Sequence, residues 1–200
     1  MEMNRRAFIV NTGRVLGGLG VVSLAGLLSK SGEAKSYIRP PGSLSEEEFL
    51  NRCIRCFKCG EICPYYAIKF VGTDDGKSMD TPMLIPRENA CQLCMKCGEI
   101  CPTQAIEKIV RDKKVIAQKV KMGIPRLNKA TCLSWNNRSC GICYMNCPYQ
   151  NEAITVLPGE RPVVHPEKCV GCGVCEMVCL TNPASIWIEP LDDLASKGRV

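Results

Sequence analysis

The sequence is poor in two residue types on which many proteins depend. Its single histidine, His165, argues against any chemistry that needs several imidazole groups. The aromatic residues are 4 Phe, 5 Tyr and 2 Trp among 200 residues, so apolar packing alone would build only a thin core. Cysteine is the opposite extreme, with 16 residues. The composition therefore indicates that the cysteines help to hold the chain together.

Long apolar runs are missing as well, apart from one near the amino terminus. Val15–Leu28 is 14 residues long and contains four glycines, which is short for a membrane span but typical of the hydrophobic part of an export signal. It follows Arg5 and Arg6 in the phrase NRRAFIV, which resembles the twin-arginine export signal, although Asn4 stands where Ser or Thr is usual. We therefore expect residues 1–34 to be a twin-arginine-type signal segment, either cleaved or kept as an anchor. An ordinary basic signal is the alternative.

The sixteen cysteines form four groups of four, and none is left over. They are Cys53, Cys56, Cys59 and Cys63; Cys91, Cys94, Cys97 and Cys101; Cys132, Cys140, Cys143 and Cys147; and Cys169, Cys172, Cys175 and Cys179. Three groups have the spacing C-x2-C-x2-C-x3-C, and the third group differs only in its first gap, which is x7. In bacterial ferredoxins the first three cysteines of such a run bind one [4Fe–4S] cluster and the fourth binds the neighbouring cluster. The sequence therefore predicts four [4Fe–4S] clusters, with all sixteen cysteines as iron ligands.

Two other uses of cysteine compete with this interpretation. An exported chain could be a disulfide scaffold, but such a scaffold does not require four nearly identical quartets. Zinc uses four ligands, usually as two separated pairs, and would leave the middle cysteine of each triplet without a role. Iron–sulfur ligation is therefore the favoured interpretation.

Two loops of the chain repeat each other closely. The phrase KCGEICP occurs as Lys58–Pro64 and again as Lys96–Pro102, which indicates an internal duplication. Each loop should lead into a short helical turn and a strand, and the strands are expected at 68–71, 154–157 and 186–188. A capping box from Ser45 to Glu48 predicts a short helix that ends near Arg52.

These elements predict an α+β fold of two tandem ferredoxin-like modules, each built around two clusters. After a linker and short helix at 35–52, the modules are expected at 53–125 and 126–200. Because neighbours in sequence usually neighbour in space, we expect each module to pair its own two loops. The fourth cysteine of one loop, namely Cys63, Cys101, Cys147 or Cys179, then joins the triplet of the other. The alternative is a nested pairing of loop one with loop four and of loop two with loop three, as in subunits of molybdenum oxidoreductases.

The formal charge of +6 does not indicate a nucleic-acid partner. Residues 1–34 contain four basic and two acidic residues, so the remainder carries +4. Each oxidised cluster with four thiolates contributes about two negative charges, which brings the loaded protein to about −4. We therefore expect no nucleic acid. Clusters must also be inserted before thiols meet an oxidising compartment, which suits twin-arginine export of a folded protein.

Three longer phrases resemble the NapG/MauM-type ferredoxins: 39–64, 132–148 and 169–198. One departure is the plain x2 middle gap of the second group, which NapG-type members commonly lengthen. The resemblance implies a periplasmic electron-transfer protein without an active site of its own, part of a quinol dehydrogenase system at the inner membrane. Its expected partners are a membrane-bound quinol-oxidising iron–sulfur protein and a periplasmic redox acceptor, such as a cytochrome or reductase. Periplasmic nitrate reductase and methylamine oxidation are the systems concerned.

Two other functions are compatible with four clusters: an electron-transfer subunit of a membrane-associated molybdenum oxidoreductase, and an iron–sulfur assembly or maturation factor. In any of these roles, apolar side chains should shield the clusters. We expect this of Ile54, Ile62, Leu93, Ile100, Ile142 and Val174, and we expect Tyr65 and Tyr66 to pack on a cluster.

Overall fold

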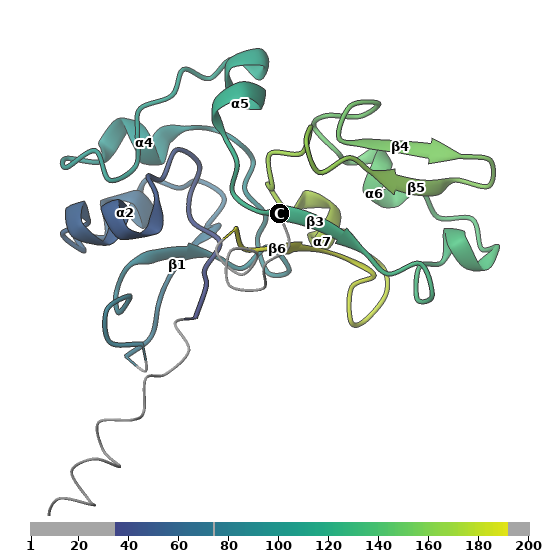
Figure 1. Ribbon diagram of the computed structural model, residues 1–200, viewed down its shortest axis with the longest axis horizontal. Coiled ribbons are helices and arrows are strands. Elements are labelled where there is room, and N and C mark those ends of the chain that lie inside the picture. The colour runs from purple at the N-terminus through teal and green to yellow at the C-terminus, as the bar shows by residue number, and fades with distance from the viewer. Residues whose placement is uncertain (1–34, 74, 192–200) are drawn as a thin grey trace, which may run out of the picture. The chain divides into compact units, whose positions relative to one another are not determined.

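Figure 1 shows the computed structural model, which describes residues 35–73 and 75–191. The expected signal segment lies outside these residues. Ser36–Val200 form one compact unit, whose described part combines short helices with two-stranded antiparallel sheets. The predicted α+β class is confirmed. No helix within the described ranges is long and apolar enough to span a membrane.

The first half of the unit is built around one hairpin. Strand β1 (Ile68–Phe70) pairs with β2 (Pro82–Leu84), and Ile68 lies opposite Leu84. Helices α2 (Glu46–Arg52), α3 (Lys58–Glu61) and α4 (Lys96–Ile100) complete it. A second, shorter antiparallel contact joins Ser43 to Ile106. The hairpin forms because Ile68 and Leu84 are both buried in the core.

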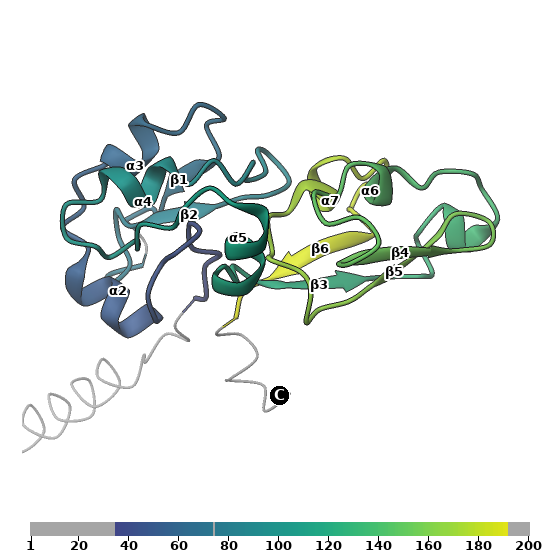
Figure 2. The ribbon, with the colours of Figure 1, turned by 90° about the horizontal axis from the view of Figure 1, so that it is seen from above.

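The second half repeats this layout with longer strands. Strands β4 (Ile154–Leu157) and β5 (Arg161–Val164) form the hairpin. Strand β3 (Ile124–Leu127) pairs with β6 (Ile186–Glu189), in the place that the Ser43–Ile106 contact has in the first half. The helical elements are η1 (Ser134–Asn136), α6 (Ile142–Met145) and α7 (Val174–Met177). In Figure 2, α3 lies beside α4, and α6 lies beside α7.

Helix α5 (Lys113–Lys119) occupies the connection between the halves. The Asp112 carboxylate caps it by accepting hydrogen bonds from the backbone N–H groups of Lys114 and Val115, at 2.9 and 3.0 Å. Within the helix, Ile116 is buried, whereas the basic side chains are exposed. The basic stretch of the sequence is therefore the outer face of a helix.

The predicted capping box at Ser45 does not form. Helix α2 does begin directly after Ser45, but the serine side chain makes no capping hydrogen bond. Glu48, its expected partner, instead pairs with Arg52 at 2.5 Å, one turn along the helix. Glu46 turns to Arg39, whose guanidinium also lies 4.8 Å from the ring centre of the fully buried Phe49. Ion pairs have replaced the cap.

Backbone and side-chain hydrogen bonds join the two halves. The N–H group of Cys91 donates to the carbonyl of Cys172 at 3.0 Å, and that of Met122 donates to the carbonyl of Val170 at 2.9 Å. Arg87 reaches across and donates to the carbonyls of residues 176, 179 and 181, at 2.8, 2.8 and 3.1 Å. The second and fourth cysteine loops are therefore held against each other.

Gly123 lies where the connection, β6 and the fourth loop meet. A Cβ atom at this position would stand 2.4 Å from Ile188 Cγ2 and 2.7 Å from the Glu189 carbonyl oxygen. We expect Gly123→Ala to reduce the free energy of unfolding by about 1–3 kcal/mol, the usual cost of overpacking. Anaerobic thermal unfolding of the loaded protein measures this. Gly72→Ala is the control, because nothing lies within 4 Å of its Cβ position; equal midpoints for the two variants would contradict the packing argument.

Candidate functional site

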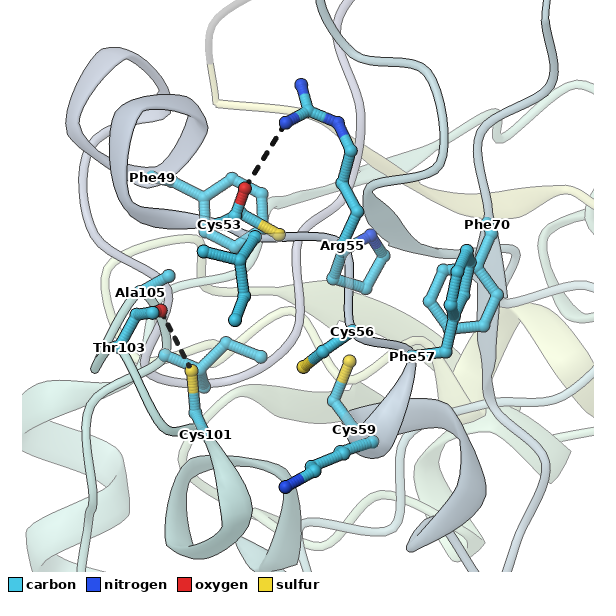
Figure 3. Close-up of a pocket in the computed structure, with 14 residues that line it drawn as sticks. Phe49, Cys53, Arg55, Cys56, Phe57, Cys59, Phe70, Cys101, Thr103 and Ala105 are labelled. Atoms are coloured by element: carbon cyan, nitrogen blue, oxygen red, sulfur yellow. Dashed lines mark hydrogen bonds between the residues drawn. The ribbon is translucent and has the colours of Figure 1, made fainter.

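The first cavity brings together cysteines from two loops. Its lining includes Cys53, Cys56 and Cys59 from the first group and Cys101 from the second group. Figure 3 shows the four side chains pointing into the same space. Phe57 and Phe70 meet edge to face at one side, with their ring centres 4.6 Å apart. Apolar walls and four sulfurs are what an iron–sulfur cluster requires.

Two further cavities have the same design. One is lined by Cys91, Cys94 and Cys97 with Cys63 from the preceding loop. The other is lined by Cys132, Cys140 and Cys143 with Cys179 from the following loop. The x7 gap before Cys140 accommodates the η1 turn, and Cys132 still reaches its cavity. The irregular third group therefore converges like the others.

The remaining four cysteines form the fourth set. Burial raises the pKa of Cys175 most, and the nearby thiols of Cys172, Cys169, Cys143 and Cys147 raise it further, so these sulfurs lie close together. Burial raises the pKa of Cys172 most, and the nearby thiols of Cys169 and Cys147 raise it further. All four sets thus bring cysteines together within one half of the molecule, as the sequential pairing expects and the nested pairing does not.

The four sets also adjoin one another in a definite order. Cys97 of the second set lies near Cys59 of the first. Cys91 contacts Cys172 of the fourth set through the 3.0 Å backbone hydrogen bond. Cys175 of the fourth set lies near Cys143 of the third. The spatial order is therefore one, two, four, three. We call the first and third sets outer and the second and fourth sets inner.

Burial raises the pKa of several cysteine thiols in these cavities and so disfavours free thiolates. Burial, followed by repulsion from neighbouring cysteines, raises the pKa of Cys59 and Cys97 to about 12 and that of Cys143 to about 11. Burial also raises the pKa of Cys172 to about 12. A buried anion becomes favourable only beside a compensating positive charge, which iron supplies when it displaces the thiol protons. The four thiolates of each set therefore fit the positively charged iron–sulfide core of a cluster.

The fourth cysteines of loops two and four behave differently. Burial acts to raise the pKa of Cys101, but hydrogen bonds from Ile106, Thr103 and Ala105 together outweigh it, and the pKa is lowered. Burial is likewise outweighed at Cys179, whose pKa is lowered by hydrogen bonds from Thr181, Ser185 and Ile186. These two sulfurs therefore lie in polar surroundings that favour negative charge.

Backbone conformation aims further donors at the sulfurs. The residue after the second cysteine of each group is left-handed, with φ of 61° at Phe57, 62° at Met95, 57° at Gly141 and 78° at Gly173. Such turns direct successive N–H groups towards one point and favour anions there. Gly141 and Gly173 adopt this conformation without strain, whereas Phe57 and Met95 do not. These two positions could not be predicted from the sequence, because neither residue type favours positive φ.

Several expected shielding residues are exposed instead. Leu93 and Val174 are buried and Ile142 is half-buried. Ile54 lines the first cavity but is 62% exposed, and Ile62 and Ile100 are exposed as well. Tyr66 does not pack on a cluster site, because it is 76% exposed, whereas Tyr65 lines the second cavity. The short loops face solvent on one side, so apolar residues between ligands do not all turn inward.

Double variants test the grouping. We expect Cys53→Ala with Cys101→Ala to lose no more iron than either change alone, because both sulfurs serve one cavity. Cys53→Ala with Cys63→Ala should lose iron from two sites, up to about 8 of about 16 atoms. Iron analysis of anaerobically purified protein measures this. Additive losses for the first pair and non-additive losses for the second would contradict the grouping.

Comparisons with known proteins agree with this geometry. A family model described as a 4Fe-4S dicluster domain matches residues 52–105 and 138–182. The ferredoxin-type protein NapG of Escherichia coli is 34% identical over 100% of this chain and 90% of its own length. The methylamine utilization ferredoxin-type proteins MauM of Methylorubrum extorquens and Paracoccus denitrificans are each 34% identical, over 90% and 99% of this chain and 88% and 93% of their own lengths.

The predicted cofactors are confirmed: the protein carries four [4Fe–4S] clusters and is an electron-transfer protein of ferredoxin type. The second match begins at residue 138 and so leaves out Cys132, which the structure nevertheless places at the third cavity. With relatives this similar over nearly its whole length, the chain belongs to the NapG/MauM family of ferredoxin-type proteins.

Proposed function

We propose that the protein is an exported electron relay between a membrane-bound quinol-oxidising iron–sulfur protein and a periplasmic redox acceptor. The observation that carries the proposal is the hydrogen bond from Cys91 to Cys172, 3.0 Å long. It holds the two inner sets of cysteines against each other, so the four sites form one continuous row. A protein that used its clusters only as structural supports would not need such contiguity.

The chain provides each site with its own ligands in this proposal. The two tandem modules, 53–125 and 126–200, each supply two sites. The sites are Cys53, Cys56, Cys59 and Cys101; Cys91, Cys94, Cys97 and Cys63; Cys169, Cys172, Cys175 and Cys147; and Cys132, Cys140, Cys143 and Cys179. A bound [4Fe–4S] cluster supplies one-electron redox chemistry. The protein's part is to bind and orient it, to exclude water and to donate hydrogen bonds to sulfur.

The outer ends of the row offer faces for redox partners. Cys56 is the exposed member of the sixteen cysteines, and the exposed side chains of Ile54 and Phe57 lie beside it on the same cavity. At the opposite end Leu180, which is 65% exposed, lines the third cavity. Apolar side chains next to a shallowly buried site suit short-lived contact with another redox protein.

The family relatives agree with such a role, since they are named as ferredoxin-type proteins, some of them for methylamine utilization. In this proposal the terminal acceptor belongs to a periplasmic nitrate reductase or methylamine oxidation system. The relay itself performs no substrate chemistry.

Export by the twin-arginine route has a direct test. We expect replacement of Arg5 and Arg6 by lysine to leave the cluster-loaded protein in the cytoplasm, because the charge is kept and only the recognised pair is lost. Cell fractionation with an iron assay of each fraction measures this. Unchanged periplasmic yield would contradict the route but not the relay.

A break in the middle of the row tests the relay. With Cys172→Ala, one inner site should be lost and the outer site beyond it isolated. We expect quinol and host membranes to leave at least one remaining cluster oxidised, although a small soluble reductant still reduces it. Electron paramagnetic resonance measures both states. If membranes reduced every remaining cluster as fully as the soluble reductant did, the row would not be the route.

A further inference from the structure

The outer and inner sites differ in the residue that follows their distant ligand. By distant ligand we mean the fourth cysteine of a group, which joins the triplet of the other loop: Cys63, Cys101, Cys147 or Cys179. The distant ligands of the outer sites are followed two residues later by threonine, Thr103 and Thr181. The distant ligands of the inner sites are followed at the same place by tyrosine, Tyr65 and Tyr149.

Neighbouring hydrogen bonds hold the Thr181 hydroxyl against the sulfur of Cys179. Thr181 Oγ1 lies 3.2 Å from Cys179 Sγ. The same hydroxyl accepts a hydrogen bond from the Ser185 N–H group at 2.8 Å and lies 2.8 Å from the Ser185 hydroxyl. A thiolate bound to iron carries no proton, so the threonine hydroxyl must be the donor to sulfur. Ser185 is buried and fixes the threonine in that role.

Thr103 makes the corresponding contact at the other end of the row. Its Oγ1 lies 3.8 Å from Cys101 Sγ, which is within the range of hydrogen bonds to sulfur (Figure 3). Thr103 also lines the first cavity together with Ala105. Among the described residues, Thr103 and Thr181 are the side-chain hydroxyls that meet a cysteine sulfur.

Among the described residues, neither tyrosine hydroxyl at the inner sites makes a hydrogen bond to a cysteine sulfur. Tyr149 is 3% exposed, and its hydroxyl donates to the Lys113 carbonyl at 3.1 Å. Tyr65 lines the second cavity and is 44% exposed. A tyrosine hydroxyl stands at the far end of a rigid ring and does not fold back onto a sulfur two residues earlier. Within the described part of the chain, the inner distant ligands therefore have no hydrogen bond from a side-chain hydroxyl, although Cys147 accepts a hydrogen bond from the Tyr149 backbone.

We propose that Thr103 and Thr181 are positioning residues that hold the reduction potentials of the two outer clusters above those of the two inner clusters. Reduction adds one electron and no proton, so a cluster with its four thiolates passes from two to three negative charges. An O–H donor aimed at a ligand sulfur stabilises the more negative state and raises the potential. The inference rests on the ligand sets of the proposed function, and it predicts that electrons reside at the two ends of the row.

Threonine and valine have nearly the same shape, which gives a matched test. Potentiometric titration of the whole loaded protein, followed by electron paramagnetic resonance, gives the midpoint potential of each cluster. We expect Thr103→Val to shift one midpoint to more negative potential and Thr181→Val to shift a different one. Thr103→Ser and Thr181→Ser should keep the original values, because the hydroxyl remains.

The converse change tests the inner sites. Tyr65→Thr and Tyr65→Val both open the second cavity to water, so the difference between the two variants isolates the hydroxyl. We expect the threonine variant to have the higher midpoint at one inner cluster. Tyr149→Phe should leave all midpoints unchanged, because its hydroxyl serves Lys113.

Unchanged midpoint potentials in Thr103→Val would overturn the inference. Thr181→Val could fail to bind its cluster, because Ser185 loses a hydrogen-bond acceptor. In that case the result for Thr103→Val alone decides the test. Equal shifts in the serine and valine variants would overturn it too. A protein that held zinc or disulfides in place of clusters would instead defeat the ligand sets, so the two failures are distinguishable.

Discussion

Negative charge buried in a small volume is the constraint on which the structure depends. The described part has few aromatic residues in its core, and seven of its buried residues are cysteines. Burial raises the pKa of Cys59, Cys97 and Cys172 to about 12, so the thiols stay protonated until a cation enters. Cluster binding therefore contributes to the folding free energy that the few aromatic residues do not supply.

The contact between the two halves joins their four cysteine sets into one row. The second and fourth loops meet through Cys91 and Cys172, and Arg87 satisfies carbonyls at the start of the segment that leads to β6. Gly171 allows this approach, because a Cβ atom there would stand 2.5 Å from the backbone nitrogen of Gly123. Close contact of backbones holds the inner sites together, within one hydrophobic core that includes residues of both halves.

Cysteine spacing made the cofactors, the α+β class and the strands near 68, 154 and 186 predictable, because ligand geometry is local and strands alternate. The adjacency of loops two and four was not predictable, since it depends on backbone contacts at glycines. Exposure of Ile54 and Tyr66 was missed because a loop of six or seven residues wrapped on a cluster must turn some side chains outward. The capping box at Ser45 does not form, and its expected partner Glu48 pairs instead with Arg52 one turn along the helix.

The arrangement of loops has one more consequence. In each half the second loop lies at the centre of the row and the first loop at an end, and both distant ligands of the end sites come from a Cys-x-Thr phrase. The order of loops along the row is therefore the same from either end, with a first-loop triplet and a Cys-x-Thr ligand at each tip. If the proposed relay operates, the order of the loops gives the row no direction, and the direction of electron flow would be set by which partner docks at which tip.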